Sequence, residues 1–292
     1  MALLLLMLVL PLTSAWAVAP QQTQTPPAKV GVEFSQIAIP GWMPSWSPDG
    51  RELAFVREDE QGNPDIYIRD LIGGAERRLT LDPGLDLWPR WSPDGQFIAF
   101  YSSRDGNFEL YKIQPDGSHL ERLTYDPAID WEPAWTPDGR LVFESYRDGW
   151  PELYLLGLGG AVKRLTQDFY RQAEPAVAPD SRRVAFASLR EGNWDIYVMR
   201  IDRPEMGQVR LTDSPEIERY PAWSPDGHRL AYTAFHGEAA DIYIFDFTTG
   251  EISQLTADDY LDIQPTWAPD GAAIAYASLR DSGWEIFIVP AQ

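Results

Sequence analysis

The 292-residue chain contains no cysteine and only three histidines: His119, His228 and His236. The absence of cysteine excludes disulfides, thiolate metal sites and lipid attachment through an N-terminal cysteine. The histidines occupy three different positions relative to the repeat described below, so we do not expect them to converge on a metal site or a Ser–His–Asp triad. No Gly-x-Ser-x-Gly segment occurs, and we therefore expect no hydrolase nucleophile of that type.

Positive charge is also scarce, with 24 lysines and arginines against 44 acidic residues and a net charge of −20. Phosphate backbones and anionic lipids repel such a surface, which argues against binding to nucleic acid or to a membrane surface. Soluble protein partners, cations and basic ligands remain compatible with this charge.

No charged residue precedes Lys29. Residues 1–19 are mostly apolar and end in small residues, which predicts a cleaved secretory signal, with a retained N-terminal anchor as the alternative. Residues 20–30 are rich in proline and glutamine and are predicted to form an extended linker. We therefore expect a periplasmic or secreted protein, with no membrane contact beyond the signal or anchor, and a monomer.

The most abundant signal is a repeat. The segment Trp-Ser-Pro-Asp-Gly at residues 91–95 recurs, slightly altered, at residues 46–50, 135–139, 177–181, 223–227 and 267–271. The motif aspartates lie 42 to 46 residues apart. A period of about 40–45 residues is typical of propeller blades with four strands each. The sequence thus predicts an all-β fold, a six-bladed β-propeller that occupies residues 31–292.

The second copy illustrates one blade. Turn residues at 92–95 and 103–106 separate short apolar strands near residues 89–91, 97–100 and 109–111, and a fourth strand follows near residues 122–124. The last copy ends after its third strand. We expect residues 31–40 to pair beside residues 284–289, to complete the last blade and to close the ring, since closure removes an exposed sheet edge.

Recurring polar residues receive structural interpretations. The aspartate of each Pro-Asp-Gly segment is predicted to accept backbone N–H bonds within its turn. Four arginines recur at one blade position, Arg104, Arg147, Arg190 and Arg280. We expect them to form ion pairs between blades.

The loops between blades open onto one face, where the residue before each inner-strand proline varies and is predicted to rim the central channel. The candidate binding residues on this rim are Trp88, Trp131, Glu132, Arg171, Glu174, Arg219, Tyr220 and Gln264. Such a mixture of aromatic and charged residues suits protein recognition. A sugar stacked on tryptophan and a solvated rim without a ligand are the alternatives.

Four acids stand three residues before a proline and could form a ring that holds a hard cation: Asp86, Asp130, Glu218 and Asp262. The chain has no Asp-x-Asp-x-Asp-Gly loop, so we expect no cofactor, and Ca²⁺ is the alternative.

The repeated Trp-Ser-Pro-Asp-Gly, Ile-Ala-Phe, Ser-Arg-Asp-Gly, Glu-Leu-Tyr and Arg-Leu-Thr segments resemble the propeller repeat of the TolB family, over residues 44–290. TolB is the periplasmic component of the Tol–Pal envelope system and carries an α/β domain before its propeller. The resemblance implies a stand-alone propeller without that domain. Similar blades occur in tricorn-type and prolyl-oligopeptidase-type peptidases and in oligogalacturonate lyases.

We therefore expect a non-catalytic exported scaffold that binds an envelope or extracellular protein. The alternative is a carbohydrate-binding or carbohydrate-active propeller that uses carboxylates and tryptophan at the channel mouth. A purely structural module is the third hypothesis.

Overall fold

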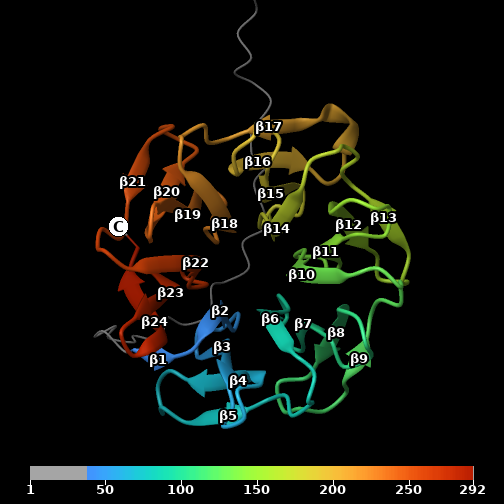
Figure 1. The fold of residues 1–292 in the computed structure, drawn as a ribbon, viewed down its shortest axis with the longest axis vertical. Coiled ribbons are helices and arrows are strands. Elements are labelled where there is room, and N and C mark those ends of the chain that lie inside the picture. The colour runs from blue at the N-terminus through green and yellow to red at the C-terminus, as the bar shows by residue number, and fades with distance from the viewer. Residues whose placement is uncertain (1–37, 292) are drawn as a thin grey trace, which may run out of the picture.

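The computed structural model describes residues 38–291, whose regular structure is almost entirely β. The strands form four sheets of four strands and one sheet of eight, arranged around a central axis (Figure 1). The first two four-stranded sheets are β2 (Trp42–Trp46), β3 (Glu52–Glu58), β4 (Pro64–Asp70) and β5 (Glu76–Arg78), followed by β6 (Asp86–Trp91), β7 (Ile98–Ser102), β8 (Glu109–Ile113) and β9 (Glu121–Arg122). The third is β10 (Asp130–Trp135), β11 (Leu141–Ser145), β12 (Glu152–Leu156) and β13 (Val162–Arg164). The fourth is β14 (Gln172–Val177), β15 (Arg183–Ser188), β16 (Asp195–Arg200) and β17 (Gln208–Arg210). The larger sheet contains β1 (Ile39–Pro40), β18 (Ile217–Trp223), β19 (Arg229–His236), β20 (Ala239–Asp246), β21 (Ile252–Gln254), β22 (Leu261–Trp267), β23 (Ala273–Arg280) and β24 (Gly283–Pro290), and the short 3-10 helix η1 (Pro204–Met206) precedes β17.

The eight-stranded sheet consists of two groups that a single parallel residue pair joins, Ala240 with Leu261. One group is β18–β21, and the other is β22–β24 with β1. β1 pairs antiparallel with β24, and Ile39 lies fully buried opposite Ile286. A strand from the start of the described chain thus lies beside the last strand.

The core lies between the sheets because neighbouring sheets cover both faces of each one. Phe100 of β7 packs with Ile68 of β4 in one interface. Tyr101, the next residue along β7, packs with Phe143 of β11 in the opposite interface. Full burial of such a side chain contributes about 1.5–3 kcal/mol, so the stability is distributed around the axis.

The repeated turns form as predicted. Asp94 Oδ1 accepts the Ser92 hydroxyl at 2.6 Å and the Gln96 N–H at 3.0 Å. Gly95 has φ of 69°, which suits a residue without Cβ. In the third copy, which is one residue shorter, the Thr136 N–H bonds to the Arg140 carbonyl and the turn itself absorbs the difference.

The prediction that the recurring arginines form ion pairs between blades is wrong. Arg104 donates to both oxygens of Asp86, at 2.8 and 2.9 Å, and Arg147 donates to Asp130 at 2.8 and 3.0 Å. Each pair lies within one sheet because the start of the innermost strand is the antiparallel neighbour of the end of the second strand. The other two arginines bind acids in the loops that lead into their own sheets, in the pairs Arg190–Asp168 and Arg280–Asp258.

The predicted signal or anchor at residues 1–19 and the predicted linker at residues 20–30 lie outside the described residues. The same holds for residues 31–37 of the predicted closing strand, of which only Ile39–Pro40 are described as a strand. Within residues 38–291, no helix has the length and apolar character that a membrane crossing requires.

Candidate functional site

Six residues at equivalent positions surround the central channel. Each innermost strand contains a register shift at the residue before its proline. These residues have φ between 54° and 59° and are Met43, Trp88, Glu132, Glu174, Tyr220 and Gln264; we call them the bulge ring. Left-handed backbone costs a residue with a Cβ about 1–2 kcal/mol, and a bulge redirects the side chain that it carries.

Side chains of the bulge ring hold one another in place. Glu132 Oε2 accepts the N–H of Glu174 at 2.8 Å, and Glu174 Oε2 accepts the N–H of Tyr220 at 2.8 Å. The Gln264 amide oxygen accepts the N–H of Met43 at 3.1 Å. Each bond joins two neighbouring sheets, so these side chains link the sheets around the axis.

Two aromatic members of the ring meet across the channel. The centroids of Trp88 and Tyr220 lie 6.0 Å apart, although β6 and β18 stand on opposite sides of the axis (Figure 1). Trp88 is only 4% exposed. We call this contact the partition, because it spans the channel between two innermost strands on opposite sides of the axis.

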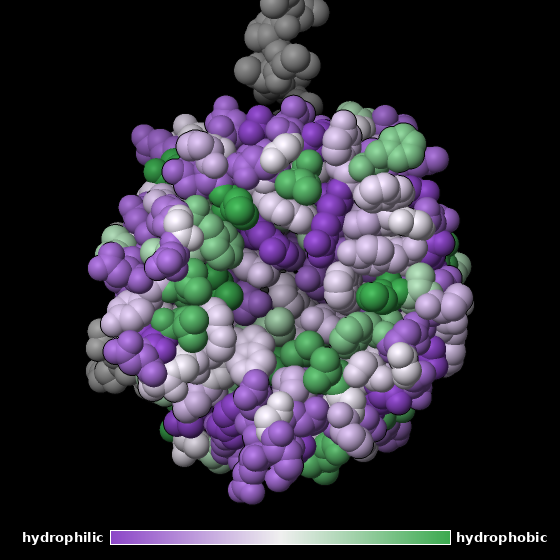
Figure 2. Space-filling model, viewed as in Figure 1, coloured by the Kyte–Doolittle hydropathy of each residue, from purple (hydrophilic) through white to green (hydrophobic). Residues whose placement is uncertain are grey.

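The channel runs between two faces of the molecule. Antiparallel strands alternate in direction, so the Pro-Asp-Gly turns lie on one face, which we call the turn face, and the loops between sheets lie on the other, the loop face. Figure 2 shows one face of the molecule, with a hollow at the axis where hydrophilic and hydrophobic side chains adjoin.

The loop-face side of the partition carries charge. Glu174 forms an ion pair with Arg219, whose guanidinium lies 5.0 Å from the centre of the Trp194 ring. Arg171 also lies over Trp194, at 5.5 Å, and its Nε is buried without a hydrogen-bond partner among the described residues. The predicted residues Glu174, Arg171 and Arg219 are therefore brought together.

A second acid lies in this cluster. Glu144 of β11 is fully buried and is the cross-strand partner of Trp131. Neither of its carboxylate oxygens has a hydrogen-bond partner within residues 38–291. Burial raises the pKa of Glu144 well above its usual value, the nearby charge of Glu132 raises it further, and Arg171 opposes the shift.

Burial also raises the pKa of Glu174, although Arg219 opposes this shift. The charge of Glu132 adds to the increase, whereas the N–H bond from Tyr220 reduces it. Two carboxyl groups on the loop-face side thus favour their protonated forms more than an exposed glutamate does.

Aromatic side chains complete the loop-face side. Trp131 packs edge-on against Tyr146 at 5.7 Å and lies 6.2 Å from Tyr101. Tyr220 lies 6.4 Å from Phe235. Trp131 is half-buried, so one part of its indole supports the wall and another part reaches solvent.

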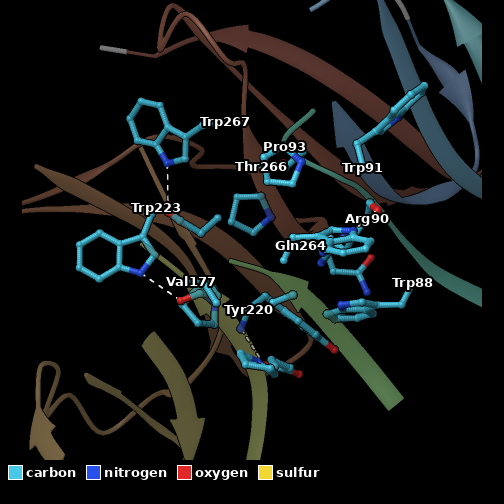
Figure 3. A pocket seen from close by; sticks show the side chains of 18 residues that line it. Trp88, Arg90, Trp91, Pro93, Val177, Tyr220, Trp223, Gln264, Thr266 and Trp267 are labelled. Atoms are coloured by element: carbon cyan, nitrogen blue, oxygen red, sulfur yellow. Dashed lines mark hydrogen bonds between the residues drawn. The ribbon is translucent and has the colours of Figure 1, made fainter. Parts of the chain in front are cut away.

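The turn-face side is a pocket of about 250 Å³ (Figure 3). Trp88, Glu174, Tyr220 and Gln264 close its inner end, and prolines of the innermost strands and tryptophans of the repeated motif also line it. Four motif tryptophans are fixed by indole hydrogen bonds to a carbonyl of the adjacent sheet: Trp46 to Thr266, Trp135 to Arg90, Trp223 to Ala176 and Trp267 to Ala222.

Arg90 is the cation of this pocket. It is half-buried, and its guanidinium lies 4.7 Å from the centre of the Trp88 ring. Its Nη1 donates to the Pro89 carbonyl at 3.1 Å. Burial lowers the pKa of Arg90 to about 10, and the nearby charge of Glu132 opposes this shift. Arg90 therefore stays positively charged near neutral pH.

The four acids of the predicted cation ring lie apart, in separate groups of strands. Asp86 and Asp130 bind Arg104 and Arg147 as described, and Glu218 accepts the Ser214 hydroxyl at 2.8 Å. Asp262 accepts the Ser278 hydroxyl at 2.5 Å. Each carboxylate is thus bound within its own sheet or the loop that leads into it.

One group of three carboxylates with ligand atoms within 4.8 Å of one another occurs in the described part of the chain: Asp241, Asp258 and Asp262. Arg280 binds Asp258 at 3.1 Å, and His236 binds Asp241 at 2.9 Å. Burial raises the pKa of Asp262 to about 6. Basic partners thus already bind Asp258 and Asp241, whereas Asp262 Oδ2 has no hydrogen-bond partner among the described residues. The other two histidines lie elsewhere in the fold, outside this group.

Sequence reasoning missed Glu144 and Arg90. Glu144 stands in a strand where the equivalent residues are Val56, Tyr101, Ala187, Thr233 and Ala277, and Arg90 stands where they are Ser45, Ala134, Ala176, Ala222 and Thr266. Alignment of the six copies position by position would have revealed both charges.

Antiparallel sheets arranged around an axis, each with its innermost strand beside a central channel, define the protein as a β-propeller. A family model described as the TolB beta propeller domain matches residues 31–170 and 160–288. The chain belongs to this TolB propeller family.

Individual relatives agree with this assignment. The crystal structure of TolB from Acinetobacter baumannii superposes with a TM-score of 0.70 and 29% identity, and the match covers 80% of this chain and 57% of that one. A putative TolB from Agrobacterium tumefaciens gives a TM-score of 0.69 at 21% identity and covers 86% and 90% of the two chains. The Tol-Pal system protein TolB of Alcanivorax borkumensis is 38% identical over 63 residues, which are 22% of this chain and 14% of that protein.

Enzymes share the fold as well. An oligogalacturonate lyase in complex with manganese superposes with a TM-score of 0.61 at 17% identity, over 87% of this chain and 90% of that one. At this identity the likeness shows the fold alone.

Proposed function

We propose that this protein is a non-catalytic, exported propeller of six blades that binds a protein partner through its loop face. The observation that carries the proposal is the concentration of exposed apolar side chains on that face. They lie in the loops between sheets, in the turns between second and third strands, and at adjoining strand ends: Leu81, Leu85, Tyr125, Trp150, Phe169, Tyr170, Leu189, Ile217, Tyr260 and Leu279. Large apolar surfaces rimmed by polar residues are typical of protein-binding sites.

The composition near the channel supports the same use. Arg171, Arg219 and Trp131 are half-buried, and arginine and tryptophan are the residues that contribute most to protein interfaces. Tyr220, Trp88, Glu132, Glu174 and Gln264 hold the floor beneath them through the partition and the bulge-ring hydrogen bonds. A rigid floor with exposed apolar loops suits a preformed interface.

Export to the periplasm or beyond is part of the proposal. It is supported by the apolar, uncharged residues 1–19 and by the Tol-Pal system protein TolB among the relatives.

The blade count and closure complete the proposal. Four sheets have four strands, and each of the two groups in the larger sheet also contains four when β1 is counted with β22–β24. Substitution of the buried Ile39 by Asp should therefore destabilise the ring by several kcal/mol, since an unpaired charge would be buried. An unchanged urea unfolding curve would contradict closure by β1.

Site-specific photo-crosslinking tests the partner surface. Phe169 on the loop face and Leu158 on the turn face are 83% and 80% exposed, so they form a matched pair for a photoreactive amino acid. We expect the probe at position 169 to capture one envelope protein of the source organism, and the probe at position 158 to capture none. Equal capture at both positions, or capture that survives Trp150→Ser with Tyr170→Ser, would contradict the proposal.

Glu144 favours a second candidate, a carbohydrate-active propeller. A buried carboxyl group that favours its protonated form is the kind of group that acts as general acid in glycoside hydrolysis, and Glu132 supplies a second carboxyl nearby. This candidate predicts slow turnover of an oligosaccharide that Glu144→Gln abolishes without loss of folding. Turnover that is equal in the wild type and in Glu144→Gln would exclude it.

A further inference from the structure

The turn-face pocket differs from the proposed partner surface, because it lies on the other side of the partition and opens on the opposite face. Five of the six residues that precede the motif line it, Arg90, Ala134, Ala176, Ala222 and Thr266. The four small residues leave the space open, and Arg90 alone brings a charged side chain into that space from this position (Figure 3).

Arg90 has unused hydrogen-bonding capacity. A guanidinium has five N–H donors, and the one that reaches a protein acceptor bonds to the Pro89 carbonyl within the described chain. No carboxylate in residues 38–291 forms an ion pair with Arg90, in contrast to Arg219, which binds Glu174. A half-buried cation that no carboxylate contacts directly gains more from an anionic ligand than an exposed arginine does.

The other walls limit what the ligand can be. Trp88 supplies an aromatic floor, and Gln264 lines the same pocket with its amide oxygen already bonded to the Met43 N–H. Its amide N–H groups remain available as donors beside the arginine. A volume of about 250 Å³ admits a single ring or one amino acid residue and no larger body.

The charges in and near the pocket favour a ligand with a single negative charge. One planar guanidinium matches one carboxylate through two parallel hydrogen bonds. The nearby charge of Glu132 and the net charge of −20 disfavour a dianion such as a phosphate monoester. We propose that the turn-face pocket binds a monocarboxylate, with the carboxylate on Arg90 and the apolar body against Trp88 and the prolines that line the pocket.

Such a carboxylate could belong to a free organic acid or to the C-terminus of a peptide. Calorimetric titration of the full chain distinguishes the two sources with benzoate as the first probe and N-acetyl-trialanine, which has a free C-terminus, as the second. Benzamide and the trialanine C-terminal amide are the uncharged controls. Binding of benzoate alone assigns the pocket to free acids, and tighter binding of the peptide assigns it to a chain terminus.

Variants test the role of each wall. Arg90→Gln should weaken carboxylate binding at least tenfold, since it removes a charge-assisted pair of hydrogen bonds, and Arg90→Lys should restore part of the affinity. Ala222→Leu fills the pocket, leaves Arg90 in place and should also abolish binding. Arg51→Gln, a change at an exposed turn residue, should leave affinity unchanged.

Three results would overturn the proposal. One is equal binding of the carboxylates and their uncharged controls. The other is carboxylate affinity that stays the same in folded Arg90→Gln and Ala222→Leu proteins, whose folding a thermal melt verifies. Failure to bind either carboxylate at tens of millimolar would also refute it. None of these results bears on the loop-face partner, which the crosslinking experiment tests separately.

Discussion

The two sides of the partition are built from the same six strands, yet they differ in chemistry. On the loop-face side, Glu144, Glu174 and Arg219 lie within one cluster. On the turn-face side, alanines, prolines and indoles surround Arg90, and Glu174 reaches only the inner end of the pocket. Three bulge-ring side chains, Glu132, Glu174 and Gln264, link neighbouring sheets. Residues before and after the bulge ring along the innermost strands therefore lie in two different environments.

Among the substitutions considered, removal of Trp88 from the partition should cause the largest loss of stability. Trp88→Ala removes the ring that contacts both Tyr220 and Arg90 and leaves a cavity at the axis, so we expect a loss of about 3–5 kcal/mol in the free energy of unfolding. Trp150→Ala is the matched control, because that indole is 55% exposed, and it should change stability by less than about 0.5 kcal/mol. Urea unfolding measures both, and a loss below about 1 kcal/mol at Trp88 would show that the partition is not formed.

The next largest loss of stability is expected on the loop-face side, from removal of the charge of Glu174. Glu174→Gln retains an oxygen for the Tyr220 N–H but leaves the half-buried Arg219 without its counter-charge. We expect a loss of about 2–3 kcal/mol in urea unfolding. Glu251→Gln, at an exposed position on the outer edge of a sheet, should be neutral. Equal behaviour of the two variants would mean that the ion pair contributes nothing.

The pH dependence of the free energy of unfolding tests whether Glu144 is a buried titrating carboxyl group. Its pKa is raised in the folded state, so between the unfolded value of about 4.3 and the folded value the native protein holds a proton that the unfolded chain has released. Stability conferred by this group is complete below that window and falls as pH rises, by at most about 1.4 kcal/mol per pH unit. Glu144→Gln cannot titrate.

The free energy of unfolding of Glu144→Gln should therefore increase relative to wild type as pH rises from about 4.5 to 8. Glu174 titrates in both proteins and largely cancels in this difference. A difference that is independent of pH would show that Glu144 is not a buried titrating carboxyl.

The smallest effect tests the wall of the turn-face pocket. Trp135→Phe removes the indole bond to the Arg90 carbonyl and should cost about 1 kcal/mol more than Trp91→Phe, since the Trp91 Nε1 has no partner in the described chain. Thermal or urea unfolding of the two variants gives the comparison. Equal losses would mean that the indole bonds between sheets do not stabilise the fold.

Much of the fold follows from the repeat. The motif spacing predicted the strands and turns, and the shortened third copy was absorbed by the turn at Thr136. The position before proline was expected to face the channel, and the structure gives all six residues there one unusual conformation. These features are periodic, so six copies reinforce each prediction.

The site was less predictable because its contacts break the period. Trp88 and Tyr220 are 132 positions apart and meet only through the arrangement of the sheets around the axis. Glu144 stands within an otherwise apolar strand, at a position where the repeat has no recurring polar residue. The arginines expected to bridge blades bind within their sheets, because the geometry of one antiparallel pair decides their partners.

The central claim is that the partition separates two sites of different chemistry. Its most direct test is an NMR titration of the ¹⁵N-labelled protein with benzoate, in which the indole N–H signals of Trp131 on the loop-face side and of Trp88 and Trp135 at the turn-face pocket are assigned by Trp→Phe substitution. We predict that Trp88 and Trp135 shift with one binding constant and that Trp131 does not move. A Trp131 signal that shifts as far as the other two, with the same constant, would contradict the separation.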